Sequence, residues 1–281
     1  MADKTPENLD KLNSFEWRNL LTEQPQLADK CNKWDEFTSK DWEILLREQP
    51  QLADKCDKWD EFKEWHWREI LIYQPQLADK CNKWEFSTTN WSMLLDKQPQ
   101  FADKCDKWDE FEYGEWHRLI EKHPQFIDEA KEYSAGWAVI LATTPELADE
   151  CDKWDEFTPD DWQLILVFQP QFIDMCDENL LFEYGPAQWW RLLVFQPQFA
   201  YMCDCWEDFD SYEWSEILQA QPQFAYKCDY WEYFDSSEWS EILQAQPQFA
   251  DKCDKWDEFT SEDWDNLLKK QPQLADKKSK K

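Results

Sequence analysis

Glycine is scarce in this chain, and its scarcity argues against one large class of binding site. The 281 residues include only three glycines, Gly114, Gly136 and Gly185. A loop that cradles phosphate groups uses several neighbouring glycines, because a backbone without side chains can approach the ligand closely. The three glycines are far apart here, so the sequence predicts no nucleotide-binding loop.

Basic residues are also few compared with acidic ones. The chain has 30 lysines and arginines against 61 aspartates and glutamates, which gives a net charge of −31. A charge of this sign and size disfavours direct contact with nucleic acid or an anionic membrane, and it favours cations and basic partners. We therefore expect no direct nucleic-acid partner and no membrane partner.

Long apolar runs are missing as well. Residues 1–7 contain no apolar core of a signal peptide, and no segment approaches the length of a membrane span. We expect a cytoplasmic protein. We also expect the basic cluster at residues 277–281 to act as a solubilising tail rather than as a localisation signal.

Histidine is as rare as glycine, and no motif for a reaction is present. His66, His117 and His123 have no cysteine or second histidine at the spacing of a metal site, so we expect them on the surface. The loop acids, such as Asp57 and Asp60, are interleaved with lysine and lack the glycine of a calcium-binding loop, which favours a solvated face. The sequence predicts no catalytic residue, no metal, no cofactor and no enzyme activity.

Tryptophan, by contrast, is abundant and keeps a regular distance from proline. Eleven times a tryptophan is followed eight positions later by a proline, and the prolines are mostly 25 residues apart, with single steps of 24, 21 and 27. A fixed period of this size is typical of a tandem-repeat array, in which each unit buries its apolar face against its neighbours. The pairs are Trp17/Pro25, Trp42/Pro50, Trp67/Pro75, Trp91/Pro99, Trp116/Pro124, Trp137/Pro145, Trp162/Pro170, Trp189/Pro197, Trp214/Pro222, Trp239/Pro247 and Trp264/Pro272.

Each repeat is expected to contain two helices, as the repeat that starts at Phe37 illustrates. Thr38 and Asp41 form a capping-box pattern at the start of the first helix, and Phe37 is placed to pack on Trp42 as a hydrophobic staple. Pro50 ends this helix and is well placed to begin the second one. Helices this short are not stable alone, so the repeats must stack.

The predicted fold class is therefore all-α. We expect an α-solenoid of about eleven αα-hairpin (helix-turn-helix) repeats, each about 25 residues long. The expected organisation is a single repeat domain over residues 1–281, with an N-terminal cap at 1–16, repeats at 17–272, and a C-terminal cap and basic tail at 273–281.

The cysteines follow the same period. Nine of the ten lie six residues after a repeat proline. Equivalent positions in stacked helices are about 8–10 Å apart, whereas a disulfide needs Cα atoms within roughly 7 Å. We expect buried, reduced thiols and a reducing compartment. Cys205 lies outside this ladder and is predicted to be exposed, and its spacing from Cys203 gives a weak hint of a metal or redox site.

Two series of tryptophans run through the repeats. The helix tryptophan lies on an apolar stripe in all eleven repeats and is predicted to be a core residue. A loop tryptophan, nine residues after most of the prolines, is also expected to pack on the core, with stacking on a sugar or base as the alternative. The loop series is Trp34, Trp59, Trp84, Trp108, Trp154, Trp206, Trp231 and Trp256.

One segment of the repeat resembles a known group of sequences. Gln98–Trp108 and Gln246–Trp256 share the string Gln-Pro-Gln-Phe-Ala-Asp-Lys-Cys-Asp-Lys-Trp. This string resembles short tryptophan-rich tandem repeats found in bacterial proteins, and the likeness extends over nearly the whole chain. The resemblance implies a helical array of bacterial type, and it transfers no activity and no catalytic residue.

Residues 167–233 break the pattern of the array. Two positions late in the first helix, which are charged at Arg47 and Glu48, become valine and phenylalanine in two consecutive repeats, and positions in the second helix and loop change from charged residues to tyrosine and methionine. An earlier repeat carries Ile72 and Tyr73 at the same helix positions. Apolar groups rimmed by charge mark contact sites. The predicted partner-binding residues are Val167, Phe168, Met175, Trp190, Val194, Phe195, Tyr201, Met202, Tyr226, Tyr230 and Tyr233.

An internal role for these side chains is the alternative. The repeat between Pro170 and Pro197 is two residues longer than the others and has Asn179 in place of the loop tryptophan. The extra apolar groups would then fill a defect in that repeat.

Taken together, the sequence predicts a non-enzymatic scaffold that binds a protein or peptide, either a basic partner or another copy of itself. Two other hypotheses stay open. One is an acidic decoy that mimics nucleic acid and blocks a basic protein, and the other is glycan binding through exposed loop tryptophans.

Overall fold

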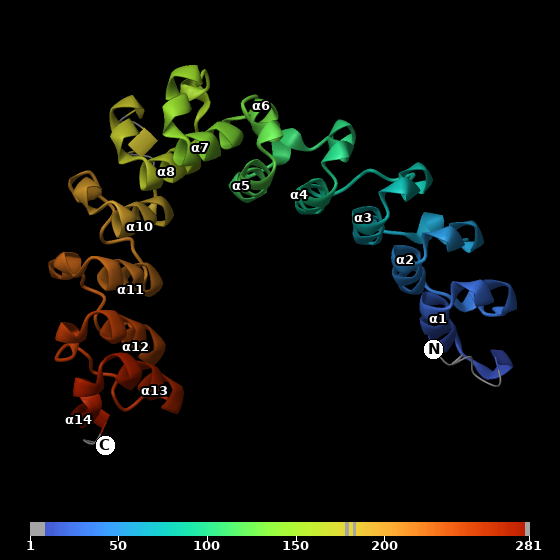
Figure 1. Cartoon of the computed structure of the whole chain (residues 1–281). Helices are drawn as coiled ribbons and strands as arrows, with labels where there is room; N and C mark the ends of the chain where they lie inside the picture. The colour runs from blue at the N-terminus through green and yellow to red at the C-terminus, as the bar shows by residue number, and fades with distance from the viewer. Residues whose placement is uncertain (1–8, 178–179, 182–183, 279–281) are drawn as a thin grey trace. The chain divides into compact units, whose positions relative to one another are not determined.

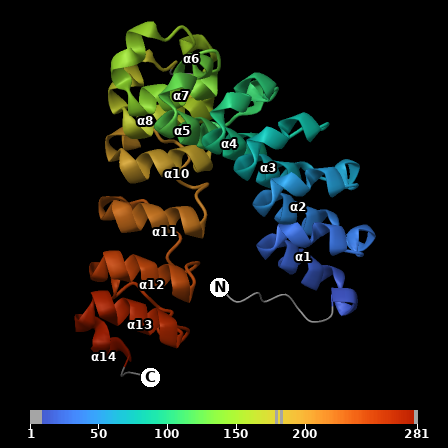
Figure 2. The same ribbon diagram turned by 45° about the vertical axis from the view of Figure 1, so that its right-hand side comes forward.

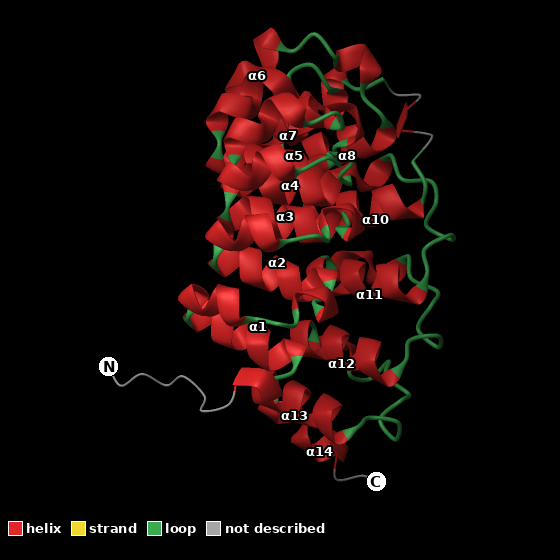
Figure 3. Ribbon diagram, turned by 90° about the vertical axis from the view of Figure 1, so that its right-hand side faces the viewer, coloured by secondary structure: helices red, strands yellow, loops and turns green. Residues whose placement is uncertain are grey.

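The computed structural model describes residues 9–177, 180–181 and 184–278. All regular secondary structure in these residues is helical, and no strand is present among them (Figure 3). The predicted all-α fold of sequentially packed repeats is therefore confirmed. The chain divides into two compact units, Met1–Gly136 (unit 1) and Trp137–Lys281 (unit 2), and the prediction of a single domain stays a prediction.

Each repeat contributes one ten-residue α-helix that carries the repeat tryptophan. In unit 1 these are α1 (Ser14–Glu23), α2 (Ser39–Glu48), α3 (Glu64–Tyr73), α4 (Thr88–Lys97) and α5 (Tyr113–Lys122); in unit 2 they are α8 (Pro159–Phe168), α10 (Pro186–Phe195), α11 (Ser211–Ala220), α12 (Ser236–Ala245) and α13 (Ser261–Lys270); and the boundary between the units falls within α7 (Ser134–Thr143). Within each unit, successive helices lie side by side and pack on one another (Figures 1 and 2).

The second helix of the repeat is a 3₁₀-helix through most of its length, not the expected α-helix. The bond from the Leu27 N–H to the Gln24 carbonyl (3.1 Å) starts η2, and the extended backbone of Cys31 (φ −72°, ψ 125°) ends it. Only six residues lie between, and a 3₁₀-helix spans them with more rise per residue than an α-helix. These elements are η2 (Pro25–Lys30), η4 (Pro50–Lys55), η6 (Pro75–Lys80), η7 (Pro99–Lys104), η9 (Pro124–Phe126), η10 (Pro145–Glu150), η12 (Pro170–Met175), η13 (Pro197–Tyr201), η14 (Pro222–Tyr226), η15 (Pro247–Phe249) and η16 (Pro272–Leu274).

Further short helical turns complete the repeats. Several of them contain the loop tryptophan, and two α-helical turns directly follow a 3₁₀-helix. They are η1 (Leu9–Lys11), η3 (Trp34–Glu36), η5 (Trp59–Glu61), η8 (Trp108–Glu110), η11 (Trp154–Glu156), α6 (Ile127–Ala130) and α14 (Ala275–Lys278).

The predicted caps are present at the starts of the α-helices. At α2 the Thr38 hydroxyl accepts the Asp41 N–H (3.2 Å), and the Asp41 carboxylate accepts the Thr38 N–H (3.1 Å). Asp210 and Asp235 cap α11 and α12 in the same reciprocal way. Each box satisfies two backbone donors that a helix start leaves without an intrahelical partner.

The helix tryptophans form the core, as predicted. All eleven are buried, with no ring more than 3% exposed. The loop tryptophan stacks on the helix tryptophan of the following helix: Trp34 lies 5.1 Å from Trp42 with ring planes 12° apart, and Phe37 meets the same Trp42 at 5.4 Å as the predicted staple. The stack repeats in both units, with Trp256 lying 5.5 Å from Trp264.

The stacking covers one face of the loop tryptophan and links it to the next repeat. Trp206 stacks on Trp214 at 5.7 Å and also contacts Phe224, on the next 3₁₀-helix, at 5.3 Å. Trp206 is buried, whereas the other loop tryptophans keep part of their surface in solvent. These rings therefore join the core of one repeat to the core of the next.

A ladder of glutamine side chains, which sequence reasoning missed, connects successive repeats. The Gln196 amide donates to the Val167 carbonyl at 2.6 Å, and the Gln221 amide donates to the Val194 carbonyl at 2.7 Å. These carbonyls lie in the last turn of the preceding α-helix, where no intrahelical donor remains. Gln198, two residues on, donates in turn to the Gln196 side-chain oxygen at 2.9 Å. This arrangement explains the Gln-Pro-Gln string that marks most repeats.

All ten cysteines are free thiols, and nine of them are buried. Burial raises the pKa of the ladder thiols, to about 12 at Cys56 and Cys253. The prediction that Cys205 is exposed is wrong. Its small, weakly polar side chain turns inward and contacts Cys203, with the two sulfur atoms 3.8 Å apart.

Candidate partner-binding surface

The predicted residues of unit 2 occupy three recurring positions of the repeat. The first is the last residue of the α-helix, where Phe168 ends α8 and Phe195 ends α10. Both rings are 60% exposed. Since α8 packs directly on α10, these two equivalent positions belong to one row along the array.

The second position is the end of the 3₁₀-helix. Tyr201 ends η13 and Tyr226 ends η14, and they are 81% and 78% exposed. Met175, which ends η12 one repeat position later, is also exposed. The third position is the loop that follows, where Tyr233 is exposed and its ring lies 5.1 Å from that of the half-buried Tyr230.

The remaining predicted residues are half-buried. Val167 and Val194 are partly covered, and their carbonyls accept the glutamine ladder. Trp190 was expected to face outward, but its ring meets Tyr212 of the next helix edge-on at 5.8 Å. Met202 is also half-buried.

Tyr212 itself is an aromatic residue that sequence reasoning did not select. It is 55% exposed on the first turn of α11, two residues before the helix tryptophan. The same repeat position carries serine at Ser237 and lysine at Lys40, so its departure from a polar residue is a signal in the sequence.

The exposure of these rings bears on the alternative of internal repair. A side chain with half or more of its surface in solvent cannot fill a packing defect, which disfavours repair for Phe168, Phe195 and the exposed tyrosines. Repair is a better description of Trp190, because that half-buried ring packs edge-on against Tyr212 of the next repeat. Asn179, which marks the missing loop tryptophan, lies outside the described residues.

The charge around this surface is strongly one-sided. Arg191 is the only lysine or arginine between Lys153 and Lys227, whereas aspartates and glutamates continue through the same stretch. The exposed aromatic groups are therefore set in an acidic background. This combination suits a partner that brings basic side chains together with apolar ones.

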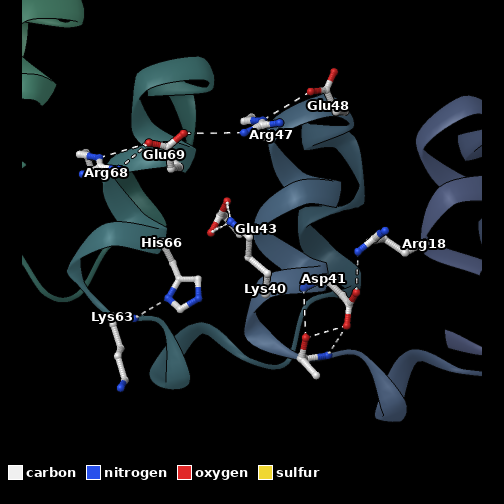
Figure 4. A network of polar contacts seen from close by, with 11 residues as sticks. Arg18, Lys40, Asp41, Glu43, Arg47, Glu48, Lys63, His66, Arg68 and Glu69 are labelled. Atoms are coloured by element: carbon white, nitrogen blue, oxygen red, sulfur yellow. Dashed lines mark hydrogen bonds and ion pairs between the residues drawn. The ribbon is translucent and has the colours of Figure 1, made fainter. Parts of the chain in front are cut away.

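Unit 1 carries many ion pairs, some within one repeat and some between successive helices (Figure 4). Arg18 of α1 pairs with Asp41 of α2 at 3.0 Å, and Arg47 of α2 lies 3.7 Å from Glu69 of α3. Glu43 is fully buried, and its carboxylate accepts a 2.7 Å contact from Lys40. Arg18 and Arg47 thus join successive repeats, whereas the Lys40 pair lies within one helix.

His66 is buried, contrary to the expectation of a surface histidine. Its Nδ1 accepts the Lys63 N–H at 3.1 Å, and its ring stacks on Phe62 at 5.7 Å (Figure 4). Burial lowers the pKa of His66. It stands at the third position of α3, where other repeats have a capping carboxylate, so its role is to cap the helix start.

Two pockets lie in unit 1, and none of the predicted residues lines them. One, of ≈ 290 Å³, lies among Arg68, Met93 and Arg118, and the other, of ≈ 450 Å³, lies beside Trp108 and Glu129. In the part of the chain that the structure describes, no group of three or more histidines, cysteines, aspartates or glutamates is placed to hold a metal ion. Among the same residues, no helix has the length and apolar character needed to cross a membrane.

Comparison with known proteins adds no relative. The chain matches no protein-family model, and the comparisons with curated proteins and with solved structures gave no match.

Proposed function

We propose that this protein is a non-enzymatic repeat scaffold, and that unit 2 binds a basic protein or peptide through its exposed aromatic side chains. The observation that carries the proposal is the exposure of Phe168, Phe195, Tyr201 and Tyr226 at repeat positions that are otherwise mostly polar or small. Exposed aromatic residues are enriched at protein interfaces, because they bury a large area at a low cost in side-chain entropy.

The charge of the surface supports a basic partner over a second copy of the chain. Two copies would bring together stretches in which Arg191 is the only cation between Lys153 and Lys227. Like charges facing each other disfavour that contact, whereas lysine or arginine on a partner would be attracted to it. The ten free thiols support a reducing compartment such as the cytoplasm.

A peptide-display selection on the full chain tests the proposal. We expect the selected peptides to combine lysine or arginine with aromatic or aliphatic residues. Their affinity should then be measured by calorimetry with the wild-type chain and with the variant Val194→Gln/Phe195→Ala, which borrows the residues found at Gln219 and Ala220. We expect at least a tenfold loss of affinity and an unchanged melting temperature.

The matched control makes the same replacements at the same repeat positions in unit 1. Arg47→Gln/Glu48→Ala should bind the selected peptides as wild type does. Equal affinity of the Val194→Gln/Phe195→Ala variant would contradict the proposal, and a large fall in its melting temperature would favour internal repair. Affinity that vanishes at high salt would instead favour the acidic decoy, because contacts between charges alone are screened.

A further inference from the structure

Two thiols of unit 2 lie in direct contact. The sulfur atoms of Cys203 and Cys205 are 3.8 Å apart, and both side chains are buried. Cys203 belongs to the ladder of cysteines that follow the repeat prolines. Cys205 takes the place of a residue that is lysine in most repeats, such as Lys153 and Lys255.

The same position behaves differently in the other repeats. Lys153 is half-buried and pairs with Glu156 at 3.0 Å, while the ladder thiol of another repeat, Cys81, donates to the Lys83 carbonyl at 3.2 Å. Ladder thiols in successive repeats are held about a helix diameter apart. Cys203 and Cys205 are instead brought together by their separation of two residues, so their contact needs no movement of one repeat against another.

The contact also makes the two thiols chemically unequal. Burial raises the pKa of isolated ladder thiols, to about 11 at Cys228 and about 12 at Cys253. The hydrogen bond between the two thiols lowers the pKa of Cys205 and raises that of Cys203. Since the thiolate is the nucleophile, this direction favours Cys205 as the member of the pair that attacks an oxidant first.

We propose that Cys203 and Cys205 form an oxidation site, in which small hydroperoxides oxidise the two thiols to a reversible disulfide. The Cys205 thiolate attacks a peroxide oxygen, so that an S–O bond forms, the O–O bond breaks and hydroxide leaves to become water. Cys203, after losing its proton, attacks the Cys205 sulfur, so that the S–S bond forms and the S–O bond breaks, releasing a second water. Overall, two thiols are oxidised by two electrons and hydrogen peroxide is reduced to two waters.

The geometry favours a disulfide between Cys203 and Cys205 over one between any two thiols of the repeat ladder. The sulfur atoms must close from 3.8 Å to the ~2.05 Å of a disulfide bond, a shift confined to the short segment that joins the two residues. The segment joins the exposed Tyr201 to Trp206, whose ring packs on Trp214. The disulfide therefore forms in the segment between the candidate partner-binding surface and the core.

The test treats the reduced full-length chain with hydrogen peroxide and then alkylates it under denaturing conditions. Peptide mapping by mass spectrometry should show that Cys203 and Cys205 resist alkylation together, with the loss of two hydrogens, while the other eight cysteines are labelled. Dithiothreitol should restore both thiols. Labelling of all ten cysteines after peroxide, or irreversible oxygen addition at Cys205, would overturn the proposal.

Matched variants separate the pair from the rest of the ladder. Cys205→Lys borrows the residue found at Lys255 and should abolish the loss of two thiols, whereas Cys228→Ser should leave it unchanged. A Cys205→Lys variant that still loses two thiols to peroxide would also overturn the proposal. The reaction should be unaffected in Val194→Gln/Phe195→Ala, so this result is independent of the proposed function.

Discussion

Unit 1 and the middle of unit 2 differ in the row of surface residues at the ends of the 3₁₀-helices. In unit 1 an aspartate of one repeat pairs with a lysine of the next, as where Lys55 lies 3.2 Å from Asp29. In unit 2 the aspartate position carries Tyr201, and the lysine of the next repeat, Lys227, lies over the Trp206 ring at 5.2 Å instead. An ion-pair row has thus been exchanged for an aromatic one, while the repeat spacing is retained.

The exchange shows which positions of the repeat are free to change. An exposed ion pair contributes about 0–1 kcal/mol, so its loss costs the array little. A buried helix tryptophan, in contrast, contacts two aromatic rings, as Trp42 contacts Phe37 of its own repeat and Trp34 of the preceding one. The repeats therefore share a core, and their differences are concentrated where a partner can reach them.

The largest expected effect tests whether the two cores are equivalent. Trp116→Ala in unit 1 and Trp214→Ala in unit 2 each remove a buried indole ring, and each should destabilise its unit by about 3–5 kcal/mol. Urea unfolding followed by circular dichroism checks this. Since repeats couple to their neighbours, the transition should broaden or split. A cost below about 1 kcal/mol in one unit alone would break the comparison.

A smaller effect is expected where the array departs from its regular spacing. A methyl group added at Gly136 would lie 2.1 Å from the Ala130 carbonyl oxygen, so Gly136→Ala forces backbone apart and should cost about 1–3 kcal/mol or more. Gly114 in α5 has no atom within 4 Å of the added methyl, and Gly114→Ala should be neutral or stabilising by up to about 1 kcal/mol. Thermal unfolding of both variants measures this difference. Equal melting temperatures of the two variants would contradict the prediction.

The glutamine ladder should contribute the same free energy of unfolding in both units. Gln221→Met removes the donor to the Val194 carbonyl, and Gln98→Met removes the donor to the Ile72 carbonyl. Each leaves a partly buried acceptor unpaired, which costs about 1–3 kcal/mol. Chemical denaturation should give similar losses for the two variants, and a loss in only one of them would show that the ladder is not a uniform feature of the array.

The smallest effect is expected from restoring the ion-pair row in unit 2. Tyr201→Asp/Met202→Lys gives this repeat the residues found at Asp54 and Lys55. Its stability should stay within about 0.5 kcal/mol of wild type, because the exposed Tyr201 contributes little to the core. Affinity for the peptides selected on wild type should fall in the same calorimetric assay. A strong destabilisation would mean that the aromatic row supports the fold.

Local signals in the sequence were enough to locate the α-helices. The pattern at Thr38, Asp41 and Trp42 predicted the start, cap and buried face of α2, and all three are present. The 3₁₀ character of the second helix was not predictable in this way, because Pro50 is an equally good first residue for an α-helix and a 3₁₀-helix. The glutamine before each proline was visible, but its acceptor lies in the preceding repeat, so its role depended on how the repeats stack.

The sequence by itself determined the repeat period, the all-helical class, the caps and the buried tryptophan ladder, since all of these follow from contacts within one repeat and its immediate copies. Only the tertiary structure decided which exceptions to the pattern reach solvent. It left Phe195 and Tyr201 exposed, packed Trp190 against Tyr212, and turned Cys205 inward onto Cys203. The physical reason is that the exposure of a side chain depends on which residues of the next repeat cover it. Those residues are neighbours in space but distant in the sequence.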